Sequence, residues 1–114
     1  MKFAQPTPEL KVPDVAAAQE YYRDHFGFDI AWYNTNGRIG AVSHGECAIF
    51  FREHKGETQP SVFWCFCEDL NVAHQTLSAN GADIVDPPAN KPWGLRQFTV
   101  QDAYGNLFHF FHDL

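Results

Sequence analysis

The feature that most constrains the fold of this 114-residue chain is a weak internal repeat. Residues 12–30 and 67–84 share an aspartate, apolar residues at helical spacing, a glycine and an Asp-Ile pair, with an offset of 54 or 55 positions. In each copy the aspartate is typical of a helix N-cap and the glycine of a helix end. The repeat therefore predicts helices near 14–26 and 69–80, capped by Asp14, Gly27, Asp69 and Gly81.

Strand-like segments flank both predicted helices. They are rich in β-branched and aromatic residues and lie at 9–12, 28–33, 39–43, 47–52, 62–67, 82–86, 97–101 and 107–111. Turn-forming residues at 34–37 and 102–106 separate hairpin strands. Residues 1–114 should thus form one α+β domain of two βαβββ half-modules, at about 5–54 and 59–113. Each half leaves one sheet face uncovered, so two halves must pair around a cleft, within one chain or across a homodimer, and we expect a dimer that exchanges halves.

Composition narrows the range of partners. A net charge of −6 and a pI near 5.3 argue against nucleic acid and favour a cationic ligand. The three cysteines are odd in number and lie in apolar runs, which predicts reduced thiols and not a disulfide framework. Residues 1–8 lack a signal-peptide pattern and no apolar stretch approaches 18 residues, so we expect a soluble, cytoplasmic protein without a membrane partner.

Three segments carry a family resemblance: residues 10–15, residues 21–28, and residues 92–106 with their Pro-Trp-Gly, Arg-x-Phe and Asp-x-x-Gly-Asn motifs. They resemble the vicinal oxygen chelate superfamily of glyoxalases, extradiol dioxygenases, and fosfomycin- and bleomycin-resistance proteins. The third segment resembles the bleomycin-resistance branch most, although Ala103 stands where the family usually carries proline. The resemblance covers nearly the whole chain and implies, for that branch, antibiotic resistance by sequestration.

The resemblance also bears on metal binding. Metal-dependent members take their ligands from four positions, which here hold Thr7, Phe50, Ser61 and His109. Only His109 coordinates a divalent metal well, and one imidazole does not hold a catalytic ion. We therefore expect no metal, no other cofactor and no catalytic residue. Cys65 and Cys67 share a strand face and could offer zinc two thiolates, but no second pair accompanies them.

The binding site predicted in place of a metal centre is aromatic. Strand alternation, as read from the sequence, puts Phe63 on the cleft face and Trp64 and Phe66 against the helix. In the bleomycin-resistance branch, the positions matching Trp32 and Trp93 stack on planar rings of the drug. Arg96 could orient a carbonyl or phosphate, or form an ion pair with Asp102 or Glu9. The predicted ligand-binding residues are Trp32, Phe50, Phe63, Trp93, Arg96 and His109.

These residues favour a binding protein that sequesters a small planar aromatic antibiotic or metabolite. The main alternative is a metal-dependent enzyme of the same fold, such as a glyoxalase-like lyase, a dioxygenase or a thiol transferase. A third possibility is a structural or regulatory module whose cleft is filled by its own side chains.

Overall fold

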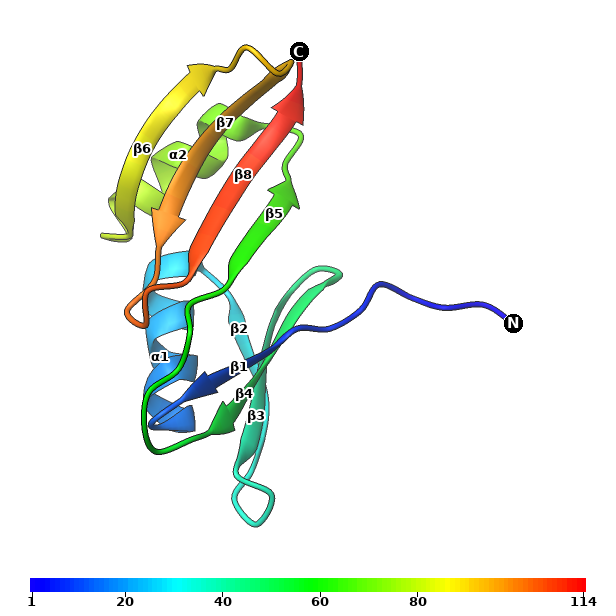
Figure 1. Cartoon of the computed structure of the whole chain (residues 1–114), viewed down its shortest axis with the longest axis vertical. Coiled ribbons are helices and arrows are strands. Elements are labelled where there is room, and N and C mark those ends of the chain that lie inside the picture. The colour runs from blue at the N-terminus through cyan, green and yellow to red at the C-terminus, as the bar shows by residue number, and fades with distance from the viewer. The chain divides into compact units, whose positions relative to one another are not determined.

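The computed structural model describes residues 1–114. The chain forms two compact units, unit 1 (Met1–Thr58) and unit 2 (Gln59–Leu114). Each unit has the order β-α-β-β-β (Figure 1). The elements of unit 1 are β1 (Glu9–Val12), α1 (Val15–Phe26), β2 (Asp29–Asn34), β3 (Ile39–His44) and β4 (Cys47–Glu53). Those of unit 2 are β5 (Val62–Phe66), α2 (Leu70–Ala79), β6 (Asp83–Asn90), β7 (Leu95–Gln101) and β8 (Leu107–Asp113).

The two units have the same sheet topology. Unit 1 contains a four-stranded sheet in the order β1-β4-β3-β2, and unit 2 one in the order β5-β8-β7-β6. The first strand of each unit pairs in parallel with the last, while the other neighbours are antiparallel. The predicted α+β fold of two βαβββ modules is therefore confirmed. Neither helix is long and apolar enough to cross a membrane.

The helix ends follow the predicted capping signals. The Asp14 side chain accepts a hydrogen bond from the Ala17 amide at 3.0 Å, and Asp69 accepts one from Val72 at 3.1 Å. Gly27 ends α1 in the left-handed region, with φ of 73°. Gly81 adopts the same conformation one residue after the C-cap of α2. These local signals explain why the repeat placed both helices correctly.

Strand β6 extends further than the sequence predicted. It runs through Pro87 and Pro88 to Asn90, whereas prolines normally end a strand. The strand lies at the edge of its sheet and its pairing with β7 shifts register twice, between Ile84 and Asp86 and between Asp86 and Ala89. An edge strand with bulges has positions whose N–H groups need no partner, so it accepts proline.

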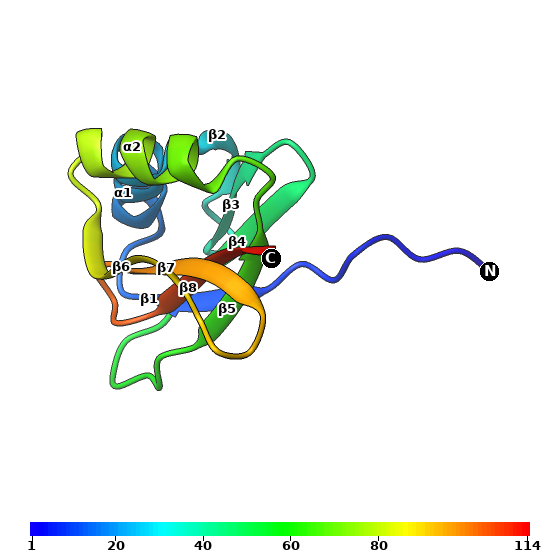
Figure 2. The same ribbon diagram turned by 90° about the horizontal axis from the view of Figure 1, so that it is seen from above.

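Each helix packs its apolar side on one face of its own sheet. In unit 1, Tyr22 of α1 is fully buried and its ring lies 4.9 Å from that of Phe51. Gly40 of β3 is required there, because an added Cβ would lie 2.7 Å from a Val15 methyl group. In unit 2, α2 lies along one side of the sheet (Figure 2), and the ring of His74 contacts that of the fully buried Phe98.

The faces of β5 are the reverse of those predicted. Phe63 pairs with Phe108 and stacks on it at 5.1 Å, on the side of the sheet that α2 covers. Trp64 lies on the opposite side and is 51% exposed. The predicted core position of Trp64 and Phe66 is therefore wrong. Strand β5 is apolar on both faces, so a period of two separates its residues into two sets without showing which set the helix covers.

Candidate functional site

The candidate site consists of the two open faces, each being the sheet face that the helix of the same unit does not cover. The open face of unit 1 carries Glu9, Lys11, Trp32, Phe50 and Arg52, whose strand neighbours Leu10 and Phe51 are buried. The open face of unit 2 carries Val62, Trp64, Phe66, Gln97, Thr99, His109 and Phe111.

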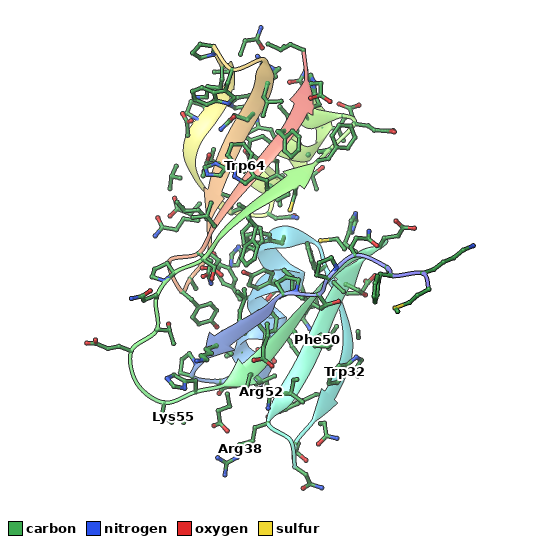
Figure 3. All side chains as sticks on the ribbon, turned by 45° about the vertical axis from the view of Figure 1, so that its right-hand side comes forward. Trp32, Arg38, Phe50, Arg52, Lys55 and Trp64 are labelled. Carbon is green, nitrogen blue, oxygen red and sulfur yellow. The ribbon has the colours of Figure 1, made fainter.

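On the open face of unit 1, the structure brings together two predicted ligand-binding residues. Trp32 of β2 and Phe50 of β4 lie on either side of Ala41, and their ring centroids are 5.1 Å apart at an angle of 68°. Figure 3 shows the two side chains next to each other. Trp32 remains 42% exposed, so this edge-to-face pair leaves an aromatic surface that can contact a planar molecule.

A β-bulge turns Trp32 onto this face. The register between β2 and β3 shifts between Ile30 and Trp32, so the two side chains point to opposite sides although they are two residues apart. The buried Gln19 of α1 donates hydrogen bonds to the carbonyl oxygens of Trp32 at 2.8 Å and Ala41 at 3.1 Å. Gln19 was not among the residues predicted to support the site. The signal available was a glutamine on the apolar side of the helix, four residues after Val15.

On the open face of unit 2, Trp64 and His109 form the central pair. Their ring centroids are 4.4 Å apart, and Thr99 forms a 2.7 Å hydrogen bond with Nδ1 of His109. Burial lowers the pKa of His109, Asp86 opposes this shift and Lys91 adds to it. The imidazole is therefore mostly neutral at pH 7 and able to accept or donate a hydrogen bond. Trp64 was not among the predicted ligand-binding residues.

Trp93 reaches the same face from the loop between β6 and β7. Its indole N–H donates to Oε1 of Gln97 at 2.9 Å, and Gln97 is a buried residue of β7 next to this loop. Most of the ring stays accessible, since Trp93 is 60% exposed. The hydrogen bond orients the indole at the edge of the open face while leaving its surface available for contact.

Two other predicted residues lie on the helix side of unit 2. Phe63 stacks on Phe108, and Arg96 precedes the buried Phe98 by two positions on the same side of β7. Arg96 donates to Asn90 at 3.0 Å instead of pairing with either predicted partner. Asp102 accepts hydrogen bonds from two backbone amides and from Asn106, and Glu9 pairs with Arg52. The structure therefore does not bring Phe63 and Arg96 to the face that holds His109.

The profile of the Glyoxalase/Bleomycin resistance protein/Dioxygenase superfamily matches residues 5–110. This chain belongs to that superfamily. It is similar to TioX from Micromonospora sp. ML1, with 28% identity over 97% of this chain and 100% of TioX and a TM-score of 0.79. No curated protein matches the sequence significantly.

Two more distant structures share the fold of the superfamily. A superfamily member from Sphaerobacter thermophilus DSM 20745 is 22% identical over 96% of this chain and 97% of its own, with a TM-score of 0.77. A glyoxalase-related enzyme from Clostridium phytofermentans is 19% identical over 100% of this chain and 98% of its own, with a TM-score of 0.79.

The residues at the metal-ligand positions of the superfamily do not fit a divalent ion. Unit 1 offers Thr7, which is exposed before β1, and the phenyl ring of Phe50. Unit 2 offers His109 and Ser61, whose backbone N–H donates to Asn106. Nowhere in the chain do three His, Cys, Asp or Glu side chains form a group that could hold a metal ion.

The cysteine pair is also a poor zinc site. Cys65 lies on the same side of β5 as Phe63, and Cys67 follows the strand with its Sγ 3.6 Å from the Asp69 carbonyl. Burial is the main cause that raises the pKa of the Cys67 thiol, so the thiolate that zinc requires is disfavoured.

The Asp-x-x-Gly-Asn motif of the superfamily is structural in this chain. The carboxylate of Asp102 accepts from the backbone amides of Tyr104 and Asn106 and from the Asn106 side chain. Asn106 in turn accepts from the Ser61 amide at 2.8 Å. These buried and partly buried contacts hold the β7–β8 turn and connect it to the chain that enters β5, so the motif identifies the fold and not the ligand.

Proposed function

We propose that this protein binds a planar aromatic molecule on its open sheet faces and sequesters it without converting it. The observation that carries the proposal is the set of aromatic side chains on these faces. Positions where metal-dependent relatives carry ligands are occupied or bordered by aromatic rings, Trp32 with Phe50 in unit 1 and Trp64 with His109 in unit 2. Sequestration requires affinity and stoichiometry but no reactive group. This agrees with the residues at the metal-ligand positions, which do not fit a divalent ion.

The size of the aromatic surface is sufficient for useful affinity. Each stacked aromatic contact contributes about 0.5–1.5 kcal/mol beyond the burial of its area. Burying apolar surface adds roughly 25 cal/mol per Å². Contacts with the rings of one open face, Trp32 with Phe50 in unit 1 or Trp64 with Trp93 in unit 2, can therefore support a dissociation constant in the micromolar range, about −8 kcal/mol.

We further propose that the protein is a homodimer in which a second copy of the chain helps to cover the open faces. Several apolar side chains of unit 2 are more than half exposed in the single chain: Val62 at 55%, Trp64 at 51%, Phe66 at 59% and Trp93 at 60%. Such contiguous apolar exposure is unusual in a monomer. Light scattering should give about twice 13.0 kDa at micromolar concentration, and a monomeric mass would contradict this arrangement.

Binding can be tested with two probes, phenazine-1-carboxamide as a neutral three-ring molecule and metal-free bleomycin as a cationic drug with a planar bithiazole. We expect saturable binding of at least one probe by calorimetry, with quenching of tryptophan fluorescence and unchanged probe at the end. Trp32→Leu should weaken binding of a probe to the open face of unit 1 about tenfold, and Trp64→Leu should do the same for the open face of unit 2.

The matched control is Tyr33→Leu. Tyr33 is also an exposed aromatic residue of β2, at 46%, but it follows Trp32 directly and so points to the other side of the strand. This variant should bind the probes as the parent does. If neither probe binds at millimolar concentration, or if a probe is chemically converted, sequestration of planar aromatics is the wrong function.

A further inference from the structure

The open face of unit 1 carries charges next to its aromatic pair. Strands β1 and β4 run in parallel, with Glu9 beside Phe50 and Lys11 beside Arg52. Arg52 follows Phe50 by two residues, so the two side chains share this face about 7 Å apart along the strand. Figure 3 shows Arg52 further along β4 from the pair formed by Phe50 and Trp32. A ligand that covers the rings therefore reaches this arginine.

The guanidinium of Arg52 is oriented but not saturated. Its Nε donates to Oε1 of Glu9 at 2.8 Å, and its Nη1 reaches the Gly37 carbonyl at 3.5 Å. A guanidinium has five N–H donors, so at least three remain without a protein acceptor. The side chain is 45% exposed. The single bond from Glu9 thus positions the group on the sheet while leaving donors for a second carboxylate.

Lys11 adds a second positive charge directly beside Arg52. It is exposed and takes part in no ion pair or side-chain hydrogen bond. Two like charges at directly paired strand positions destabilise a sheet. On β1 and β4 only one carboxylate, that of Glu9, lies with these two cations on the face. Asp29 of β2 shares the face at its other end, in the row of Ser43 and Ala48. An anion placed between Lys11 and Arg52 would relieve this repulsion.

Further cations lie near Lys11 and Arg52, although the chain as a whole is acidic. The chain has a net charge of −6, and unit 1 contains six of its eight lysines and arginines together with eight of its 14 aspartates and glutamates. Arg38 and Lys55, which share the carboxylate of Glu53, lie with Arg52 at one end of this unit (Figure 3). Ions screen charges beyond about 8 Å at physiological salt, so a bound molecule responds to these nearby cations more than to the net charge.

We infer that the open face of unit 1 selects an aromatic carboxylate, with its rings against Trp32 and Phe50 and its carboxylate bound by Arg52 and Lys11. The inference rests on the proposed function and specifies its ligand. The planar fork of a guanidinium matches the two oxygens of a carboxylate, and charge-assisted hydrogen bonds of this kind are the stronger ones. The distance along β4 suits an acid with two or three fused rings.

The test compares phenazine-1-carboxylate with phenazine-1-carboxamide, which has the same rings and nearly the same shape without the charge. For the parent chain, calorimetry at pH 7.5 and low salt should give a dissociation constant about ten- to a hundredfold lower for the carboxylate. The preference should decrease in 0.5 M NaCl. Arg52→Gln should abolish the preference and Lys11→Gln should reduce it several-fold, with little change in carboxamide binding.

Arg38→Gln is the matched control, because it removes a cation from the same end of unit 1. The ion-pair partner of Arg38 is Glu53, which lies beside Val12 in the sheet, and Val12 faces the helix. Arg38→Gln should change the preference less than about twofold. Equal binding of both probes by the parent would overturn the acid-binding site and leave the proposed function intact. Binding of neither probe would overturn both.

A preference that survives in both Arg52→Gln and Lys11→Gln would also overturn the assignment of these residues. Lys11 has no side-chain partner, so Lys11→Gln should fold as the parent does. The carboxylate and carboxamide probes can therefore still be compared on Lys11→Gln if loss of the Glu9–Arg52 bond destabilises Arg52→Gln. A melting curve for each variant checks this directly.

Discussion

Units 1 and 2 have the same topology, and their open faces can be compared position by position. The row Glu9, Phe50, Ala41 and Trp32 across unit 1 corresponds to Trp64, His109, Thr99 and Asp86 across unit 2. In the next row, Lys11 and Arg52 correspond to Phe66 and Phe111. At the two ends of the first row and at both positions of the second, aromatic and charged residues have therefore exchanged places between the two faces.

This exchange shows which features the βαβββ module requires and which it leaves open. The aspartate caps, the left-handed glycines and the bulge after the isoleucine of the second strand occur in both units. The open faces differ because no helix of the same unit packs on them, so their side chains face no common steric requirement. A difference in ligand contacts between the units can arise without any change of fold.

The largest expected effect separates the two sides of the unit 2 sheet. Phe98→Ala should lower the free energy of unfolding by about 3–5 kcal/mol, because Phe98 is fully buried under α2 and its truncation leaves a cavity. Trp64→Ala should cost about 1 kcal/mol or less, since its ring lies on the open face. Denaturant unfolding of both variants measures the difference. Equal losses would mean that the open face of unit 2 is as tightly packed as its helix side.

A smaller effect should distinguish the helices of the two units. Gln19→Ala should destabilise the protein by about 1–3 kcal/mol, because the carbonyl groups of Trp32 and Ala41 lose their buried donor. It should also shift the wavelength of Trp32 fluorescence emission, because the bulge that orients this residue loses its hydrogen bond from Gln19. His74 occupies the corresponding position of α2 and has only a 3.4 Å contact with Ser78 and an aromatic edge contact.

The control for this prediction is His74→Ala, whose effect should be less than half as large. Unfolding in denaturant gives both values, and tryptophan emission spectra of the folded variants report on Trp32. A loss for His74→Ala that equals the loss for Gln19→Ala would show that the two helices support their bulges in the same way.

Titration should affect the open face of unit 2 and not the aromatic pair of unit 1. Because the pKa of His109 is lowered in the folded state, the unfolded chain takes up a proton first as the pH falls. The contribution of His109 to the free energy of unfolding is therefore fully present above the unfolded pKa of about 6.5. It decreases as the pH falls through about 6.5 toward the folded pKa. Nuclear magnetic resonance of the imidazole should give a folded pKa below 6.5, and His109→Gln should reduce the pH dependence of unfolding. A pKa above 6.5 would contradict the assigned environment.

The smallest expected effect concerns metal. The superfamily's metal-ligand positions hold only one imidazole in this chain, that of His109. Chelation with EDTA should therefore change the melting temperature by no more than about 1 °C. Elemental analysis should find no stoichiometric zinc, nickel or manganese. About one such ion per chain would indicate a site assembled from other residues and would favour the enzyme alternative.

The sequence predicted the elements of both units more closely than it predicted the site. Trp32, Phe50, Trp93 and His109 do lie on or at the open faces, whereas Phe63 and Arg96 lie on the helix side of unit 2. Trp64 was assigned to the core by the same strand alternation that misplaced Phe63. Both errors have one cause, because a strand with apolar residues on both sides gives no sign of which side a helix will cover.

Local signals in the amino-acid sequence determined the two helices, their caps, the two turns and the repeated order of elements, since each depends on residues within a few positions of one another. Only the tertiary structure decided which face each side chain takes. That choice depends on strand register and on single-residue bulges, and a shift of one residue moves a side chain to the opposite face. The contacts of Gln19 with β2 and β3, and the position of Lys11 beside Arg52, join segments far apart in the chain, and no local pattern specifies them.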